Sequence, residues 1–179
     1  MKKNIILGVT AGVAIYKSCS LLRVLRRKGC SVKVVMTPNS TKLISAQLFE
    51  SLSGEKVYVE MFEEAKDYSI THISLAKWAQ LSLIVPASAN TLAKLAIGLA
   101  DNLLTTLFLA LPSSTPKIVA PAMNTNMWRN PLTQRNIKIL KEQGYKIISP
   151  KRGVLASQDI GEGVLADLEA ILKELEAYL

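Results

Sequence analysis

Residues 119–128 read VAPAMNTNMW, a short apolar strand that breaks at its proline and delivers Asn124 into an irregular segment. A second apolar strand, 81–85, runs into Pro86 and continues as ASANT over residues 87–91. Two strands therefore finish in Pro-Ala, with an asparagine close behind. Ligands of α/β proteins bind where parallel strands end. The sequence thus predicts a binding site at this edge of a parallel sheet.

Strand-like and helix-like segments alternate along the rest of the chain. Strands are predicted at 5–7, 32–36, 57–59, 81–85, 117–120 and 146–148. Helices are predicted at 13–28, 41–52, 71–79, 90–98, 101–111, 131–143 and 166–179, with a glycine-rich loop before the last one. This alternation predicts an α/β chain of one domain, residues 1–179. We expect a three-layer α/β/α sandwich with a doubly wound, Rossmann-like parallel sheet.

Composition limits the classes of function. The 179 residues, 49% of them apolar, suit one domain with a sizeable core. No apolar run approaches the roughly 20 residues of a membrane span, and the N-terminal apolar run is too short for a signal peptide. We expect a cytoplasmic protein with no membrane partner.

The formal net charge of +8 raises a nucleic-acid hypothesis. However, Arg23, Arg26, Arg27 and Lys28 cluster toward the end of one predicted helix, where cations suit the helix dipole. Aromatic residues are sparse and no nucleic-acid-binding motif is present. We expect no nucleic-acid partner.

Cys19 and Cys30 are the only cysteines, and His72 is the only histidine. This set supports neither a disulfide framework nor a zinc site, so we expect no metal. Both cysteines are predicted to be reduced thiols in or near the core.

The ends of the first two strands indicate which cofactor the sheet would hold. Residues 8–14, GVTAGVA, lead into a helix N-terminus, where backbone amides can meet a phosphate. Their spacing is not the GxGxxG dinucleotide fingerprint. Residues 37–41, TPNST, offer hydroxyls and an amide where a nicotinamide enzyme places an acidic residue. This turn could equally cap the next helix. Together with Ser88 and Asn90, it favours a mononucleotide flavin.

Two segments, PASANT at 86–91 and PAMNTNMW at 121–128, match both signatures of the flavin-dependent cysteine decarboxylases without a mismatch. The resemblance covers nearly the whole chain and is greatest to the phosphopantothenoylcysteine decarboxylases. It implies FMN as cofactor and the decarboxylation of 4'-phosphopantothenoylcysteine to 4'-phosphopantetheine in coenzyme A synthesis. It also implies a homotrimer or homododecamer with the flavin at a subunit interface, and a fused or separate synthetase as partner.

The resemblance also assigns roles to residues. His72, within THISLAKWA at 71–79, is the expected catalytic base, and Asn124 is expected to hold the carboxylate of a phosphorylated thiol-carboxylate substrate. The expected substrate-binding residues are Asn124, Met127, Val154, Leu155 and Ala156. The expected FMN-binding residues are Thr10, Ala11, Gly12, Val13, Thr37, Asn39, Ser40, Ser88, Ala89, Asn90, Thr91, Thr106, Ala122 and Met123.

The chain departs from the family in a late loop. Residues 153–163 read GVLASQDIGEG, where the family pattern is A-C-G-x-x-G-x-G. Ser157 therefore occupies the position of the family's catalytic acid, a cysteine, and Gln158 that of a glycine. A serine hydroxyl is a far weaker acid than a thiol. We expect that the reaction stalls at the enethiol.

Alternative functions remain open. A decarboxylase of peptide C-terminal cysteine would accept an apolar peptide instead of a phosphopantothenoyl group. A non-catalytic FMN-binding regulatory subunit is favoured by Ser157, whereas the presence of His72 and Asn124 argues against it. A prenyl-flavin synthase is less favoured, because those relatives lack the second signature. The chain ends where a fused synthetase would continue, so it could also be one domain of a longer protein.

Overall fold

A computed structural model describes residues 3–62 and 71–179, and its centre is one parallel sheet. The strands are β1 (Asn4–Val9), β2 (Ser31–Met36), β3 (Val57–Tyr58), β4 (Leu81–Ala87), β5 (Lys117–Pro121) and β6 (Tyr145–Ile147). They lie in the order β3-β2-β1-β4-β5-β6, and each neighbouring pair is parallel.

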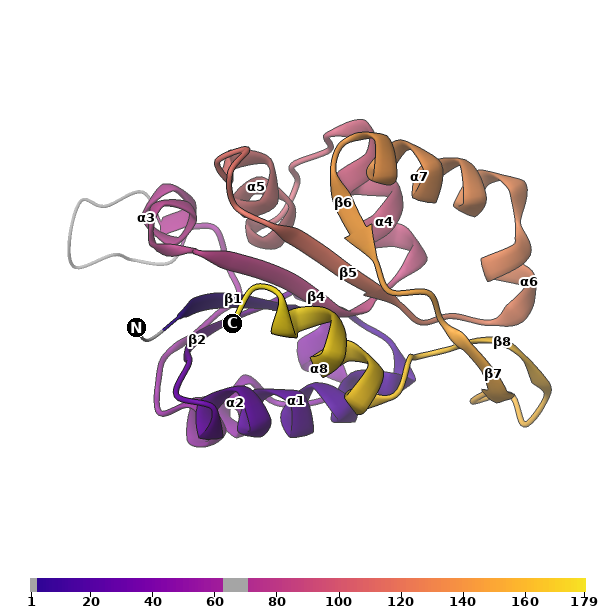
Figure 1. Cartoon of the computed structure of the whole chain (residues 1–179), viewed down its shortest axis with the longest axis horizontal. Coiled ribbons are helices and arrows are strands. Elements are labelled where there is room, and N and C mark those ends of the chain that lie inside the picture. Colours follow the sequence, from indigo (N-terminus) through magenta and orange to yellow (C-terminus); the bar gives the residue numbers. More distant parts are fainter. Residues whose placement is uncertain (1–2, 63–70) are drawn as a thin grey trace.

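Helices cover both faces of this sheet (Figure 1). On one face lie α1 (Tyr16–Arg27), α2 (Ala46–Ser53) and α8 (Leu168–Glu176). On the other lie α3 (Thr71–Trp78), α4 (Ala89–Ile97), α5 (Leu103–Ala110) and α7 (Pro131–Glu142). The predicted α/β/α sandwich with a doubly wound sheet is confirmed.

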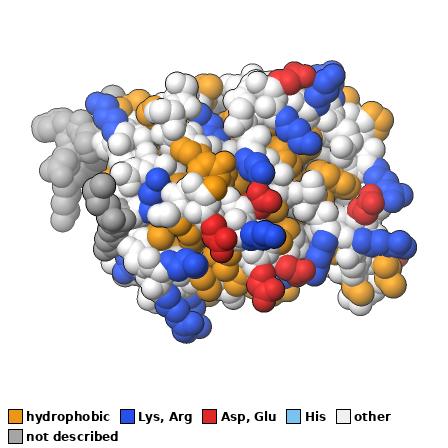
Figure 2. All heavy atoms as spheres, viewed as in Figure 1, with side chains coloured by type: hydrophobic (Ala, Val, Ile, Leu, Met, Phe, Trp, Pro, Cys, Tyr) orange, Lys and Arg blue, Asp and Glu red, His pale blue; other side chains and the backbone are white. Residues whose placement is uncertain are grey.

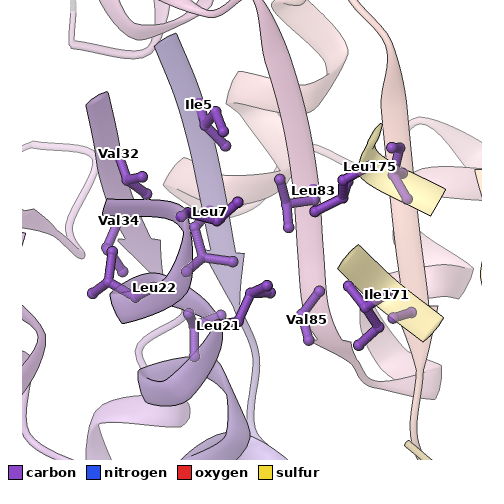
Figure 3. Packing of buried hydrophobic residues seen from close by; sticks show 14 of the residues in the cluster. Ile5, Leu7, Leu21, Leu22, Val32, Val34, Leu83, Val85, Ile171 and Leu175 are labelled. Carbon is purple, nitrogen blue, oxygen red and sulfur yellow. The ribbon is translucent and has the colours of Figure 1, made fainter. Parts of the chain in front are cut away.

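Strand periodicity explains why the sheet has two cores. Successive strand residues point to opposite faces, so Ile5 and Leu7 pack with side chains of α1 and α8 (Figure 3). Ile6 packs on the other face, with side chains of α3, α4, α5 and α7. Every residue of β4 is buried, as its continuous apolar sequence predicts for a strand covered on both sides.

The direction of winding reverses between β1 and β4, since β2 and β3 lie on one side of β1 while β4, β5 and β6 lie on the other. In doubly wound sheets this reversal opens a crevice at the carboxyl ends of the strands. The segments that leave β1, β2, β4 and β5 therefore meet at one edge, which is the edge that the sequence predicts as a binding site.

Two local predictions need correction. The helix predicted at 41–52 is divided into a 3₁₀ turn, η2 (Ser40–Lys42), and α2, because Ser45 caps α2 by accepting a hydrogen bond from the Leu48 N–H at 3.3 Å. The predicted helix 13–28 likewise begins as a 3₁₀ turn, η1 (Val13–Ile15), before α1. Asn124 lies in the irregular segment 122–124, as predicted, and it caps the short helix α6 (Thr125–Arg129), which the sequence did not predict.

The glycine-rich loop contains a hairpin that the sequence did not predict. Its strands are β7 (Lys151–Val154) and β8 (Ile160–Val164), and they pair antiparallel outside the main sheet. Two of the five residues of β8 are glycines, which carry no β-propensity signal.

The positions of the two thiols agree with the sequence interpretation. On the face shown in Figure 2, Lys and Arg side chains lie among acidic and apolar ones and do not gather in one stripe. In the described parts of the chain, no helix combines the length and apolar character needed to cross a bilayer. Cys30 is buried, Cys19 is partly buried, and both are free thiols, as predicted. Burial raises the pKa of both.

Candidate functional site

A cavity of about 580 Å³ lies at the edge where β1, β2 and β4 end, and we call it the flavin cavity. Seven of the predicted FMN-binding residues line it: Ala11, Thr37, Asn39, Ser88, Ala89, Asn90 and Thr91. Met127, predicted to bind substrate, lines it as well. The remaining lining residues are Pro38, Lys94, Asp101 and Asn102, none of which was predicted as a site residue.

Thr10 lies beneath this cavity and joins two strand ends. Its side chain is buried, and its hydroxyl donates to the Pro86 carbonyl at 2.7 Å while accepting from the Ser88 N–H at 2.9 Å. Ser88 in turn caps α4, because its Oγ accepts from the Thr91 N–H at 3.3 Å. Thr10 thus holds Ser88 in the cavity wall and does not line the cavity itself.

Two other predicted FMN ligands use their hydroxyls within the protein. Ser40 is buried and donates to the Thr37 carbonyl at 2.6 Å, which closes the turn after β2. Thr106 donates to the Ala100 carbonyl at 3.3 Å and lines neither cavity described here. The sequence cannot distinguish such supporting hydroxyls from ligand-facing ones, because both occur in the same turns.

A second cavity of about 320 Å³ lies at the end of β5, between η1 and the β7–β8 hairpin, and we call it the substrate cavity. The predicted residues that line it are Val13, Ala122, Met123, Asn124, Val154, Leu155 and Ala156. Ala14, Tyr16, Lys17, Gly163, Val164 and Leu165 complete it. Gly12 stands in the chain between Ala11 of the flavin cavity and Val13 of the substrate cavity, so the two cavities adjoin.

Asn124 is both a helix cap and a donor to the substrate cavity. Its Oδ1 accepts from the Asn126 N–H at 2.8 Å at the start of α6. Its amide nitrogen has no hydrogen-bond partner among the described residues and is exposed. An amide N–H in this position can donate to a carboxylate.

Glycines let the hairpin lie directly on the end of β5. Gly163 has φ +129°, and a Cβ there would lie 2.1 Å from the Met123 carbonyl oxygen. The Met123 N–H donates to the Gly163 carbonyl at 2.9 Å. A Cβ on Gly161 would lie 2.0 Å from Oγ1 of Thr125, a buried hydroxyl without a partner among the described residues. The G-x-G pattern of the late loop is therefore a packing requirement that forms one wall of the substrate cavity.

Ser157 lies at the exposed tip of the hairpin, two residues beyond the buried Leu155. Its hydroxyl donates to the Asp159 carboxylate at 2.8 Å. Gln158 has φ +69°, so the position of the family glycine does adopt the left-handed conformation. Neither Cys19 nor Cys30 lines either cavity.

His72 is the second residue of α3, is half-buried, and lines neither cavity. In Figure 1, α3 and the β7–β8 hairpin lie at opposite ends of the long axis of the molecule. One chain alone therefore does not bring His72 to Asn124 or Ser157.

The flavin cavity fits a mononucleotide flavin. Its volume is within the range of about 300–1,000 Å³ that small-molecule sites occupy. Hydroxyls and amides of Thr37, Asn39, Ser88 and Asn90 supply neutral hydrogen-bonding groups. The turn after β2 carries no acidic residue, unlike that of a nicotinamide site.

The model of the family described as Flavoprotein matches residues 1–179. The chain belongs to this flavoprotein family. A probable phosphopantothenoylcysteine decarboxylase of Streptococcus mutans is 48% identical over the full length of both chains. The coenzyme A biosynthesis bifunctional protein CoaBC of Bacillus subtilis is 41% identical over 98% of this chain, which spans 43% of that protein.

A solved structure of a cysteine-to-serine mutant of PPC decarboxylase, complexed with pantothenoylaminoethenethiol, superimposes with a TM-score of 0.87. It is 33% identical and covers 99% of this chain and 98% of that one. The resemblance to flavin-dependent cysteine decarboxylases is confirmed, and with it a flavin as the cofactor of the family.

Replacing each of two glycines by alanine, one in β1 and one in the turn after it, gives a matched pair of variants for comparing stability with flavin binding. In Gly8→Ala the new Cβ would lie 2.7 Å from Leu104 Cδ1, so we expect a loss of about 1–3 kcal/mol in the free energy of unfolding. In Gly12→Ala the nearest heavy atom outside the two adjoining residues, Pro86 Cγ, would lie 3.9 Å from the new Cβ, and φ is extended, so we expect the free energy of unfolding to change by less than about 0.5 kcal/mol.

Gly12→Ala should nevertheless weaken flavin binding, because it adds a methyl group to the turn that joins Ala11 of the flavin cavity to Val13 of the substrate cavity. Urea unfolding without flavin and flavin titration measure the two effects separately. A Gly12→Ala protein as unstable as Gly8→Ala would show that the turn is needed for folding and not for the ligand.

Proposed function

We propose that the protein is an FMN-dependent decarboxylase that converts 4'-phosphopantothenoylcysteine toward 4'-phosphopantetheine in coenzyme A synthesis. The observation that carries the proposal is the pair of adjoining cavities, one with neutral hydrogen-bonding groups and one containing the free amide of Asn124. Full-length similarity to the Streptococcus mutans protein supports the same activity. A synthetase, fused or separate, would supply the substrate, as the bifunctional relative suggests.

The chemistry explains why both cavities are needed. A carboxylate on the cysteine skeleton leaves as CO2 only when a neighbouring group can accept the electron pair of the breaking C–C bond. Bound FMN would supply a two-electron oxidant for the substrate thiol, and the C=S bond of the resulting thioaldehyde would lie β to the carboxylate and accept those electrons. Ala11, Thr37, Asn39 and Ser88 would hold the cofactor.

The chain's own groups then position the substrate and move protons. The Asn124 amide would donate to the substrate carboxylate, while Val154 and Leu155 would cover it from the hairpin side and exclude water. His72 would accept the proton released during thiol oxidation. Ser157 stands where the family's acid would protonate the enethiolate.

The position of α3 makes oligomerisation part of the proposal. Because His72 lines neither cavity of its own chain, we propose a homotrimer, or a dodecamer of such trimers, in which His72 completes the site of a neighbouring subunit. Light scattering should give a mass that is a multiple of three chains. A strict monomer that binds FMN tightly would contradict this arrangement.

The purified protein is expected to be yellow and to contain FMN. Under anaerobic conditions, phosphopantothenoylcysteine should bleach the flavin absorbance, and a peptide that ends in cysteine should not. A colourless protein that does not bind added FMN would overturn the proposal. Bleaching by the peptide alone would reassign the substrate to the peptide class.

Asn124→Asp is expected to weaken substrate binding at least about tenfold, because it places a carboxylate against a carboxylate. Aspartate is as good a helix cap as asparagine, so α6 should keep its start and the protein its stability. The concentration of substrate that gives half-maximal flavin bleaching measures the effect. An unchanged value, with unchanged flavin content, would remove Asn124 from the substrate site.

A further inference from the structure

Lys94 and Asp101 form an ion pair in the wall of the flavin cavity. Lys94 lies on α4 and Asp101 in the loop between α4 and α5, and Nζ lies 2.6 Å from Oδ2. The other carboxylate oxygen of Asp101 accepts from the Asn102 amide at 2.9 Å. The proposed mechanism gives this pair no role.

The pair cancels the formal charges of the cavity lining. Of the twelve described residues that line it, Lys94 is the one cation, Asp101 is the one anion, and the others are uncharged. The side chain of Lys94 is 19% exposed and that of Asp101 is 46% exposed. The hydrogen bond from Lys94 lowers the pKa of Asp101 further below neutral pH.

The loop that carries Asp101 is fixed by the protein itself. Gly98 ends α4 in the left-handed conformation, and the Leu99 N–H donates to the Lys94 carbonyl at 2.8 Å. On the other side, Asn102 caps α5 by accepting from the Thr105 N–H at 3.1 Å. The carboxylate of Asp101 is therefore held beside Lys94 without any ligand.

We propose that Asp101 limits the attraction of the flavin cavity for phosphate groups by neutralising Lys94, so that a flavin phosphate is recognised by neutral donors of residues 37–39 and 88–91. This inference rests on the proposed function. Cofactor and substrate both carry a phosphate group, and an unpaired ammonium in the cavity wall would attract any phosphate. A cavity without net charge instead selects its ligand by shape and hydrogen bonds.

The test compares FMN with riboflavin, which lacks the phosphate, on full-length protein stripped of flavin. Asp101→Asn is close to isosteric and leaves the Lys94 charge unpaired, so FMN should bind about 3- to 10-fold more tightly while riboflavin changes little. Inorganic phosphate should then compete with FMN, and added salt should remove the gain. Lys94→Met should shift the FMN-to-riboflavin preference about equally in the opposite direction.

The double variant Lys94→Met/Asp101→Asn restores neutrality and should return the preference to within about twofold of the original. Glu174→Gln is the matched control, since it also removes one negative charge from an ion pair, with Lys146 at 2.9 Å, but neither residue lines the flavin cavity. It should leave the preference unchanged.

An unchanged FMN-to-riboflavin preference in Asp101→Asn would overturn the inference. Equally weaker binding of FMN and riboflavin, together with a lower unfolding temperature, would also overturn it, because that result indicates that the ion pair only stabilises the fold. Failure of the unmodified chain to bind either flavin would overturn the proposed function as well. If the unmodified chain binds both flavins normally but the charge-changing variants leave the FMN-to-riboflavin preference unchanged, only this inference is overturned.

Discussion

Replacing His72 with asparagine is expected to leave FMN bound while slowing flavin bleaching by substrate about 10²- to 10⁴-fold, the usual contribution of a general base. The cofactor should stay because His72 lines neither cavity of its own chain. Stopped-flow absorbance under anaerobic conditions measures the rate, and the flavin-to-protein ratio confirms occupancy. An unchanged bleaching rate would remove His72 from the reaction.

Mixing subunits tests where His72 acts. If His72 completes a neighbour's site, a trimer of His72→Asn and Asn124→Asp chains contains interfaces with one intact His72 and one intact Asn124. Co-expressed chains carrying two different tags should therefore be more active, at a substrate concentration too low to saturate Asn124→Asp, than either variant alone. In the control, each single variant is co-expressed with the double variant His72→Asn/Asn124→Asp, and the activity should not recover. Inactive mixed oligomers would place His72 in the site of its own chain.

Ser157→Cys is expected to change the product, from an enethiol to the saturated aminothiol. A thiol has a pKa near 8.5 and can protonate the enethiolate, whereas a serine hydroxyl is far less acidic. The hydride that completes the saturated product would come back from the flavin that was reduced during thiol oxidation. The structural relative that carries a serine in place of a cysteine is complexed with an enethiol, which agrees with this expectation. Mass spectrometry separates the products, because the enethiol is lighter by two hydrogens.

Gln158, the residue after Ser157, is expected to limit how much saturated product Ser157→Cys forms. Gln158 has φ +69°, which costs a non-glycine residue about 1 kcal/mol. Ser157→Cys/Gln158→Gly should therefore restore the saturated product more fully than Ser157→Cys alone. Ser157→Ala is the control for the hydroxyl and should stall as the unmodified chain does. If the unmodified chain already releases the saturated product at a normal rate, Ser157 or another group is a competent acid.

The main elements were predictable because local sequence carries their signals. β4 and β5 are continuous apolar runs, which only a doubly covered parallel strand accommodates without exposing them. Ser88 and Asn90 could be assigned to the flavin cavity because they follow such a strand, and the carboxyl ends of parallel strands share one edge. The motifs then identified the family.

The hairpin and the supporting hydroxyls were not predictable from local signals. Strand β8 has no alternating pattern, and its glycines are needed by the close approach of Met123 and Thr125, two residues from another part of the chain. Thr10 and Ser40 look like ligand-facing hydroxyls in the sequence but donate inward, since buried polar groups must find partners within the fold.

The sequence by itself determined the layered α/β fold, the flavin family and the edge of the sheet that carries the site, because periodicity and strand-end motifs are local properties. Only the tertiary structure decided how that edge is divided. It separated the flavin cavity from the substrate cavity, paired Lys94 with Asp101, and placed His72 away from Asn124. Each of these features depends on the distance between segments that are remote in the sequence. The packing of whole helices and strands sets such distances, whereas the neighbours of a residue along the chain do not.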